Sequence, residues 1–166
     1  CVTHGTCPAM TTRLSADPQP RPLFVMEPAP RYVVPRPAVV DASVIAALVF
    51  AEPENAEAAR MLAGRRPLAP DILAYEITNI AATRRRRGDA LRTLQDCLGD
   101  FQAMGIELIS PDLPLVLDLA ARFNLTAYDA AYLAVAGTLQ CPLCTFDKRL
   151  ADAAQLYLAG PAEPTP

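Results

Sequence analysis

Two short apolar segments of this chain, residues 38–41 and 142–147, each end on an aspartate and lead into a helical pattern. In parallel sheets flanked by helices, the ligand crevice lies at the carboxyl ends of the strands, so Asp41 and Asp147 are expected to converge. Two further acids, Glu76 and Asp129, lie in apolar helical settings. Four converging carboxylates without a basic partner repel one another unless they bind a hard divalent cation. The pattern indicates a metal-dependent enzyme that acts on phosphodiesters.

Three of these acids also have a purely structural interpretation. Aspartate is a favoured N-cap, so Asp41 and Asp147 could do no more than cap the helices that follow them. Thr126 and Asp129 have the spacing of a capping box at a helix start. Each of these three acids, taken alone, therefore leaves a cap and a functional site as open alternatives.

Glu76 is harder to explain structurally. At helical spacing it lies between Ile72 and Ile80 on an apolar stripe, where an unpaired carboxylate is costly to bury. Asn79, one turn later, shares this face and could orient the carboxylate or a bound water. The presence of Glu76 beside three aspartates favours the functional interpretation, because independent caps do not need such a glutamate.

Alternating strands and helices must position these acids. The apolar pattern predicts strands at residues 38–41, 106–109 and 143–145, and helices at residues 43–50, 54–62, 71–87, 89–104, 113–123 and 128–139. Short hydrophobic strands separated by helices are typical of a three-layer α/β domain with a parallel sheet. The chain is long enough, at 166 residues with 52% hydrophobic composition, for one such domain.

Four segments, residues 39–43, 75–79, 125–132 and 145–150, resemble in order and approximate spacing the PIN-domain nucleases, specifically the VapC-like toxins of bacterial toxin–antitoxin pairs. The resemblance covers residues 38–158. It implies an α/β/α fold with a short parallel sheet, and RNA cleavage with Mg²⁺ or Mn²⁺. It assigns the metal ligands and catalytic residues to Asp41, Glu76, Asp129 and Asp147.

The resemblance carries further expectations. Ser43 and Thr145 match hydroxyl positions near the metal, and a cognate antitoxin and a homodimer are implied. Members of the family often finish with another strand after the last helix. Here residues 156–158 are followed at once by Gly160 and a proline-rich end, so we expect that strand to be short or missing.

A run of four cations, Arg84, Arg85, Arg86 and Arg87, closes the long predicted helix. One interpretation is a solvated helix end, where positive charge complements the helix dipole. The other is a patch that binds RNA phosphates. Because the formal net charge is −3, any nucleic-acid contact must be concentrated in such a patch.

Two other functions remain possible. The chain could be a non-catalytic PIN-like module that binds RNA or a protein, although the presence of all four acids argues against it. It could also be a Mg²⁺-dependent phosphatase that forms an aspartyl-phosphate at Asp41. That chemistry normally needs a second acid two residues later, where this chain has Ser43.

The ends of the chain differ from its middle. Residues 1–37 hold 8 of the 17 prolines, so we expect a disordered N-terminal arm there, a nuclease domain over residues 38–158 and a tail over residues 159–166. The start at Cys1 suggests a fragment or a mis-set translation start. Five cysteines form no disulfide framework, and no apolar stretch is long enough to span a membrane, which favours a cytoplasmic protein. The Cys141–Cys144 pair is too isolated to indicate a zinc or redox site.

Overall fold

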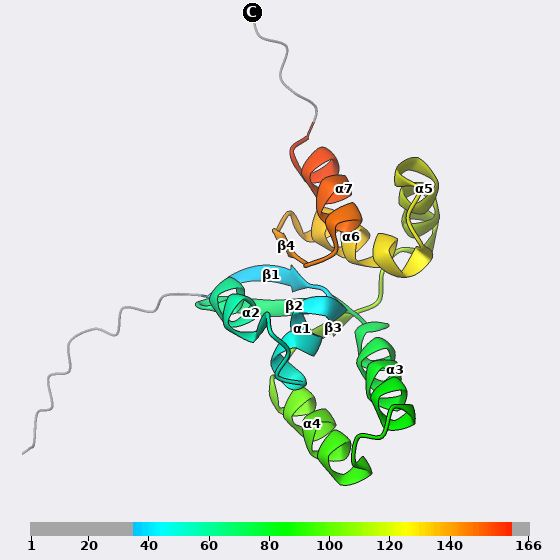
Figure 1. Ribbon diagram of the computed structural model, residues 1–166. Coiled ribbons are helices and arrows are strands. Elements are labelled where there is room, and N and C mark those ends of the chain that lie inside the picture. The colour runs from blue at the N-terminus through cyan, green and yellow to red at the C-terminus, as the bar shows by residue number, and fades with distance from the viewer. Residues whose placement is uncertain (1–34, 161–166) are drawn as a thin grey trace, which may run out of the picture. The chain divides into compact units, whose positions relative to one another are not determined.

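The computed structural model describes residues 35–160. Four parallel strands form one sheet in the spatial order β3-β2-β1-β4 (Figure 1). The strands are β1 (Arg36–Val40), β2 (Arg65–Pro70), β3 (Glu107–Ile109) and β4 (Leu143–Cys144). β1 begins two residues before the expected start of the domain. The expected N-terminal arm, as far as residue 34, and residues 161–166 of the expected tail lie outside the described residues.

Seven helices accompany this sheet in the described part of the chain, and Figure 1 shows α1 to α4 on one side of it and α5 to α7 on the other. The helices are α1 (Ala42–Val49), α2 (Asn55–Leu62), α3 (Leu73–Arg86), α4 (Leu91–Ala103), α5 (Leu113–Phe123), α6 (Ala127–Leu139) and α7 (Lys148–Leu158). The predicted three-layer α/β architecture is confirmed, and the predicted helices agree with the observed ones to within about two residues at most ends. No strand follows α7 up to residue 160, where the described part of the chain ends.

The strand β2 was not predicted. It contains Pro67 and Pro70, which cannot donate backbone hydrogen bonds and normally argue against an inner strand. The structure nevertheless pairs β2 with both β1 and β3, and buries Leu68 and Ala69. The predicted helix start at residues 70–71 was therefore slightly early, because the chain is still in the sheet at Pro70 and α3 begins at Leu73.

The helix α6 fits closely against the sheet because its side chains are small. Every residue from Ala130 to Gly137 is buried, and half of them are alanine. Gly137 is required by its surroundings, since a Cβ atom there would collide with the ring of Tyr157 from α7. Within residues 35–160, no helix has the length and apolar character needed to cross a membrane.

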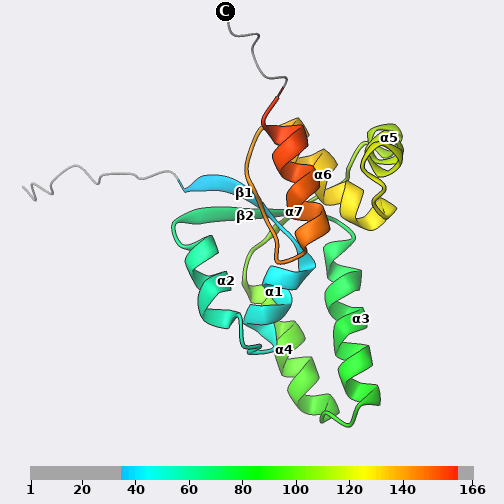
Figure 2. The ribbon, with the colours of Figure 1, turned by 45° about the horizontal axis from the view of Figure 1, so that its top comes forward.

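The helices α1 and α3 both start at the carboxyl edge of the sheet and run away from it side by side (Figure 2). Because β1 leads directly into α1, Asp41 at their junction lies at this edge. Glu76 lies in the first turn of α3, and Asp129 lies in the first turn of α6. The fold thus gathers helix N-termini, and the acids they carry, at one edge of the sheet.

Candidate functional site

Asp41 is held by three hydrogen bonds. Its side chain is only 7% exposed, and Oδ1 accepts a hydrogen bond from the Ala42 amide at 2.7 Å. Oδ2 accepts hydrogen bonds from Ser43 Oγ at 2.7 Å and from Thr145 Oγ1 at 2.8 Å. Asp41 therefore caps α1, as the structural interpretation predicted, and also accepts from Ser43 and Thr145, the two hydroxyl groups that the resemblance assigns to positions near the metal.

The two hydroxyl groups are themselves oriented by the backbone after β4. Ser43 Oγ accepts from the Phe146 amide at 3.0 Å, and Thr145 Oγ1 accepts from the Asp147 amide at 2.9 Å. Each hydroxyl has a single proton, and in both cases that proton is directed to Asp41 Oδ2. The carboxylate of Asp41 is consequently fixed in place by donors alone.

Glu76 is half-buried and bonded to a residue that the sequence pattern did not single out. The Tyr132 hydroxyl, from a side chain that is fully buried in α6, donates to Glu76 Oε2. Burial raises the pKa of Glu76, the Tyr132 hydrogen bond lowers it, and the charges of Asp41 and Asp129 raise it further. Asp41 and Asp129 are therefore both close enough to Glu76 for their charges to act on it. Burial and the neighbouring Glu76 charge raise the pKa of Tyr132, which keeps its hydroxyl protonated as a donor.

A signal for Tyr132 was present in the sequence. It follows Asp129 by three residues, so the two share one face of α6. Sequence alone could not show that this face meets Glu76, which is 56 residues away along the chain.

Asp129 and Asp147 both take part in helix capping. The Asp129 amide donates to Thr126 Oγ1 at 3.1 Å, which is the N-cap half of the predicted capping box. The Asp129 carboxylate accepts from the Thr126 hydroxyl at 2.8 Å instead of from the Thr126 amide. Asp147 caps α7 by accepting from the Leu150 amide at 2.9 Å. Asp147 is exposed and is not among the charges that raise the pKa of Glu76. It is joined to the site through its amide contact with Thr145.

The chemistry of these side chains suits a hard cation. None of the four acids forms an ion pair with an arginine or lysine among residues 35–160, although acids elsewhere in the domain do. Their negative charge is complemented instead by the positive ends of the helix dipoles. Carboxylates and hydroxyl oxygens are the ligands that Mg²⁺ prefers.

The same part of the chain holds no group of three or more acidic, histidine or cysteine side chains that could bind a metal ion as it stands. Mg²⁺ usually keeps several waters and binds proteins through one or two carboxylates. The arrangement is therefore compatible with Mg²⁺ but does not form a preassembled protein cage.

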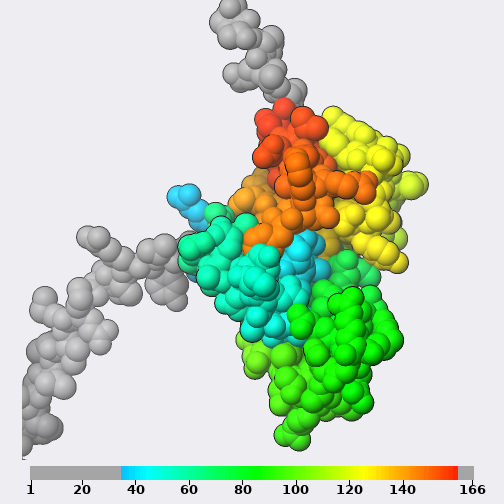
Figure 3. Space-filling view, viewed as in Figure 1, coloured from blue at the N-terminus to red at the C-terminus, as the bar shows by residue number. Residues whose placement is uncertain are grey.

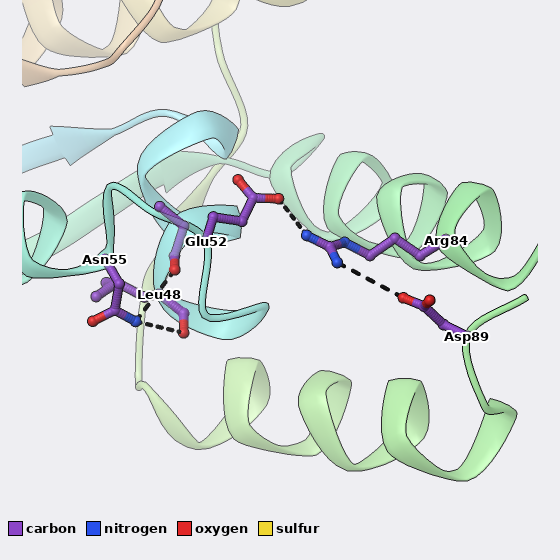
Figure 4. Close-up of polar contacts among 6 residues, drawn as sticks. Leu48, Glu52, Asn55, Arg84 and Asp89 are labelled. Atoms are coloured by element: carbon purple, nitrogen blue, oxygen red, sulfur yellow. Dashed lines mark hydrogen bonds and ion pairs between the residues drawn. The ribbon is translucent and has the colours of Figure 1, made fainter. Parts of the chain in front are cut away.

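The arginine run is not uniform. Arg84 lies between Glu52, at 2.5 Å, and Asp89, at 3.7 Å (Figure 4). Its guanidinium also stacks 4.8 Å from the centre of the Phe50 ring. Arg84 therefore joins α3 to the segment after α1 and to the turn before α4. The other three arginines of the run are exposed.

The remaining candidates occupy less central positions. Asn79 is exposed and makes no hydrogen bond to Glu76; it lies in the wall of a cavity beside Arg84. Cys141 and Cys144 are buried free thiols, and burial raises the pKa of each.

Comparison with known proteins adds an independent finding. The family model of the PIN domain matches residues 38–156. Over 120 residues the chain is 34% identical to Ribonuclease VapC3 of Pyrobaculum aerophilum, which covers 69% of this chain and 92% of that protein. The fold is similar to the crystal structure of PAE2754 from the same organism, with a TM-score of 0.54 and 23% identity, over 75% of this chain and 88% of the other.

Proposed function

Because this chain belongs to the PIN-domain family, we propose that it is a metal-dependent endoribonuclease that hydrolyses phosphodiester bonds of RNA. The observation that carries the proposal is the placement of Asp41, Glu76 and Asp129 at helix starts on one edge of the sheet, with no basic ion-pair partner among residues 35–160. Such an arrangement is costly unless a cation offsets the charge. The relative named Ribonuclease VapC3 supports RNA as the substrate.

The cofactor in this proposal is Mg²⁺ or Mn²⁺, held by Asp41, Glu76, Asp129 and Asp147. A bound divalent cation lowers the pKa of a water molecule and offsets charge on the scissile phosphate. The chain's own contribution is to hold the carboxylates still. Ser43 and Thr145 fix Asp41, and Tyr132 occupies Glu76 Oε2 and leaves Oε1 free.

We also propose that the chain is the toxin of a toxin–antitoxin pair, acts in the cytoplasm and forms a homodimer. The name of the VapC relative supports the toxin role and the existence of a cognate antitoxin. Exposed apolar side chains support protein contacts, because Leu113, Leu117 and Tyr128 are 71%, 70% and 60% exposed. Leu113 and Tyr128 line a cavity of about 380 Å³ between α5 and α6 that a partner could fill.

The test is an RNA cleavage assay with purified protein, in Mg²⁺ and in EDTA. We expect cleavage in Mg²⁺ only, and its loss in Glu76→Gln. The control is Glu57→Gln, the same change at an exposed glutamate of α2, which should cleave like the wild type. Cleavage that persists in EDTA, or in Glu76→Gln, contradicts the proposal.

The non-catalytic alternative is supported by one observation, the lack of a ready-made group of three metal ligands among residues 35–160. It predicts RNA binding without cleavage under all metal conditions. The same assay, combined with a binding measurement, separates the two functions.

A further inference from the structure

One face of α3 connects the acids with the arginine run. Arg87 follows Glu76 by 11 residues, which is close to three helical turns, and Asn79 follows Glu76 by three residues, so the three side chains follow the same side of the helix. At 1.5 Å per residue, Arg87 lies about 16 Å from Glu76 along the helix axis. A strand that starts at the acids and follows α3 therefore passes both side chains.

This face is not fully covered by the rest of the domain. The surface of α1 and α2 borders that of α3 (Figure 3). Glu52 from the segment after α1, the residues of α3 and the turn before α4 together enclose a cavity of about 370 Å³. The cavity is lined mainly by polar side chains: Glu52, Asn79, Thr83, Arg84, Arg87 and Asp89.

The two acids of this cavity, Glu52 and Asp89, both form ion pairs with Arg84 (Figure 4). Arg84 is partly buried and stacks on the Phe50 ring. Arg87 makes no ion pair with a described residue, and the amide of Asn79 makes no side-chain hydrogen bond within the domain. The side-chain donors of the cavity that have no ion pair or side-chain hydrogen bond among the described residues thus lie on Asn79 and Arg87. Arg84 instead joins α3 to the segment after α1 and to the turn before α4.

We propose that Asn79 and Arg87 form a phosphate-binding subsite for the RNA strand, beyond the scissile phosphate at the acids. This inference rests on the proposed function, because it assigns a path to that substrate. The guanidinium group of Arg87 matches a phosphate in charge and geometry, and the Asn79 amide supplies a neutral donor closer to the acids. At roughly 3.4 Å of axial rise per nucleotide, the distance to Arg87 corresponds to about five stacked nucleotides.

The inference divides the arginine run by role. Arg84 is a structural residue, whereas Arg87 contacts substrate. A solvated helix end predicts no such division, because there every exposed arginine contributes equally to a diffuse field.

The experiment measures binding of a fluorescently labelled single-stranded RNA by anisotropy, in EDTA, over a range of salt concentrations. We expect Arg87→Gln to weaken binding about 3- to 10-fold and to reduce the slope of log K against log salt by about 0.7, the value for one phosphate contact on a single strand. Asn79→Ala should weaken binding with little change in slope, because the amide is uncharged.

The matched control is Arg92→Gln, the same change at an exposed arginine of α4. It should alter binding less than 2-fold. Equal effects of Arg87→Gln and Arg92→Gln overturn the subsite, as does a failure of the wild type to bind this RNA. Melting curves of all three variants establish that they are folded.

Failure of the subsite and failure of the proposed function give different results. If the wild type cleaves RNA but Arg87→Gln binds like Arg92→Gln, the subsite is wrong and the nuclease stands. If the wild type binds RNA with the expected dependence on Arg87 but never cleaves it, the subsite stands and the nuclease is wrong.

Discussion

Neutralising Asp41 and neutralising Glu76 remove the same charge, yet the two changes should shift stability in opposite directions. In Asp41→Asn, an amide group must replace one carboxylate oxygen. Placed at Oδ2 it faces the Ser43 and Thr145 hydroxyls, which both donate; placed at Oδ1 it faces the Ala42 amide. Either orientation sets donor against donor. We expect a loss of about 3 kcal/mol in the free energy of unfolding, and a Tm lower by roughly 10 °C.

Glu76→Gln meets no such conflict. Its amide oxygen can still accept from Tyr132, and its NH₂ group turns toward the charges of Asp41 and Asp129, which repel the native carboxylate. The variant without metal should therefore be at least as stable as the wild type at neutral pH.

The difference in stability between Glu76→Gln and the wild type should increase with pH. The raised pKa of Glu76 means that the folded state binds its proton more tightly than the unfolded state does. Wild-type stability therefore falls as pH rises from the ordinary value of 4.5 through the raised folded pKa. Glu76→Gln does not lose stability in this way, because its amide does not titrate. The excess of its unfolding free energy over that of the wild type should therefore vanish below pH 4.5 and reach a plateau above the raised pKa of Glu76.

The assay is urea denaturation in EDTA of the wild type, Asp41→Asn and Glu76→Gln at several pH values, followed by circular dichroism. The control is Glu57→Gln on α2, which should be pH-independent relative to the wild type within about 0.5 kcal/mol. If Glu76→Gln is markedly less stable than the wild type at neutral pH, or Asp41→Asn is not destabilised, the assigned electrostatics of the site are wrong.

Three further variants probe single contacts. Tyr132→Phe removes the hydroxyl that donates to Glu76, and calorimetry should show Mg²⁺ affinity reduced about 10-fold or more; unchanged affinity argues against a positioning role. Gly137→Ala should lower the free energy of unfolding by about 1–3 kcal/mol, because the collision with Tyr157 outweighs the helix propensity of alanine, and Tyr157→Leu in the same chain should restore part of this loss. Arg84→Met should cost about 1–2 kcal/mol in urea denaturation, whereas Arg85→Met, at an exposed site of the same helix, should be nearly neutral.

The acids illustrate how far sequence patterns lead. An apolar run that ends on Asp41 locates a strand end, and strand ends in a parallel sheet share one edge. The roles of helix cap and site residue do not exclude each other for an aspartate in this position. A helix that begins directly after a strand brings its N-cap to that same edge. Asp41 and Asp147 each cap a helix while lying at or beside the site.

What sequence could not supply were contacts between distant segments. Nothing local to Tyr132 indicates that its hydroxyl reaches Glu76, and nothing local to Arg84 indicates that it is bound to Glu52, 32 residues away. The strand β2 was missed for a related reason. Its prolines oppose a strand locally, and only pairing with β1 and β3 places it in the sheet.

The hydrogen bond from Thr145 to Asp41 also determines when the hydrogen bonds around Asp41 can be completed. It closes a loop of 104 residues and depends on the pairing of β4 with β1, near the two ends of the described domain. Contacts that span so much of a chain form late in folding, because the entropy of the long loop must be overcome first. A ribosome that has not yet released β4 and α7 therefore carries a nascent chain whose Asp41 lacks one of its two hydroxyl donors. Assembly of the site is thereby delayed until synthesis of the domain is complete.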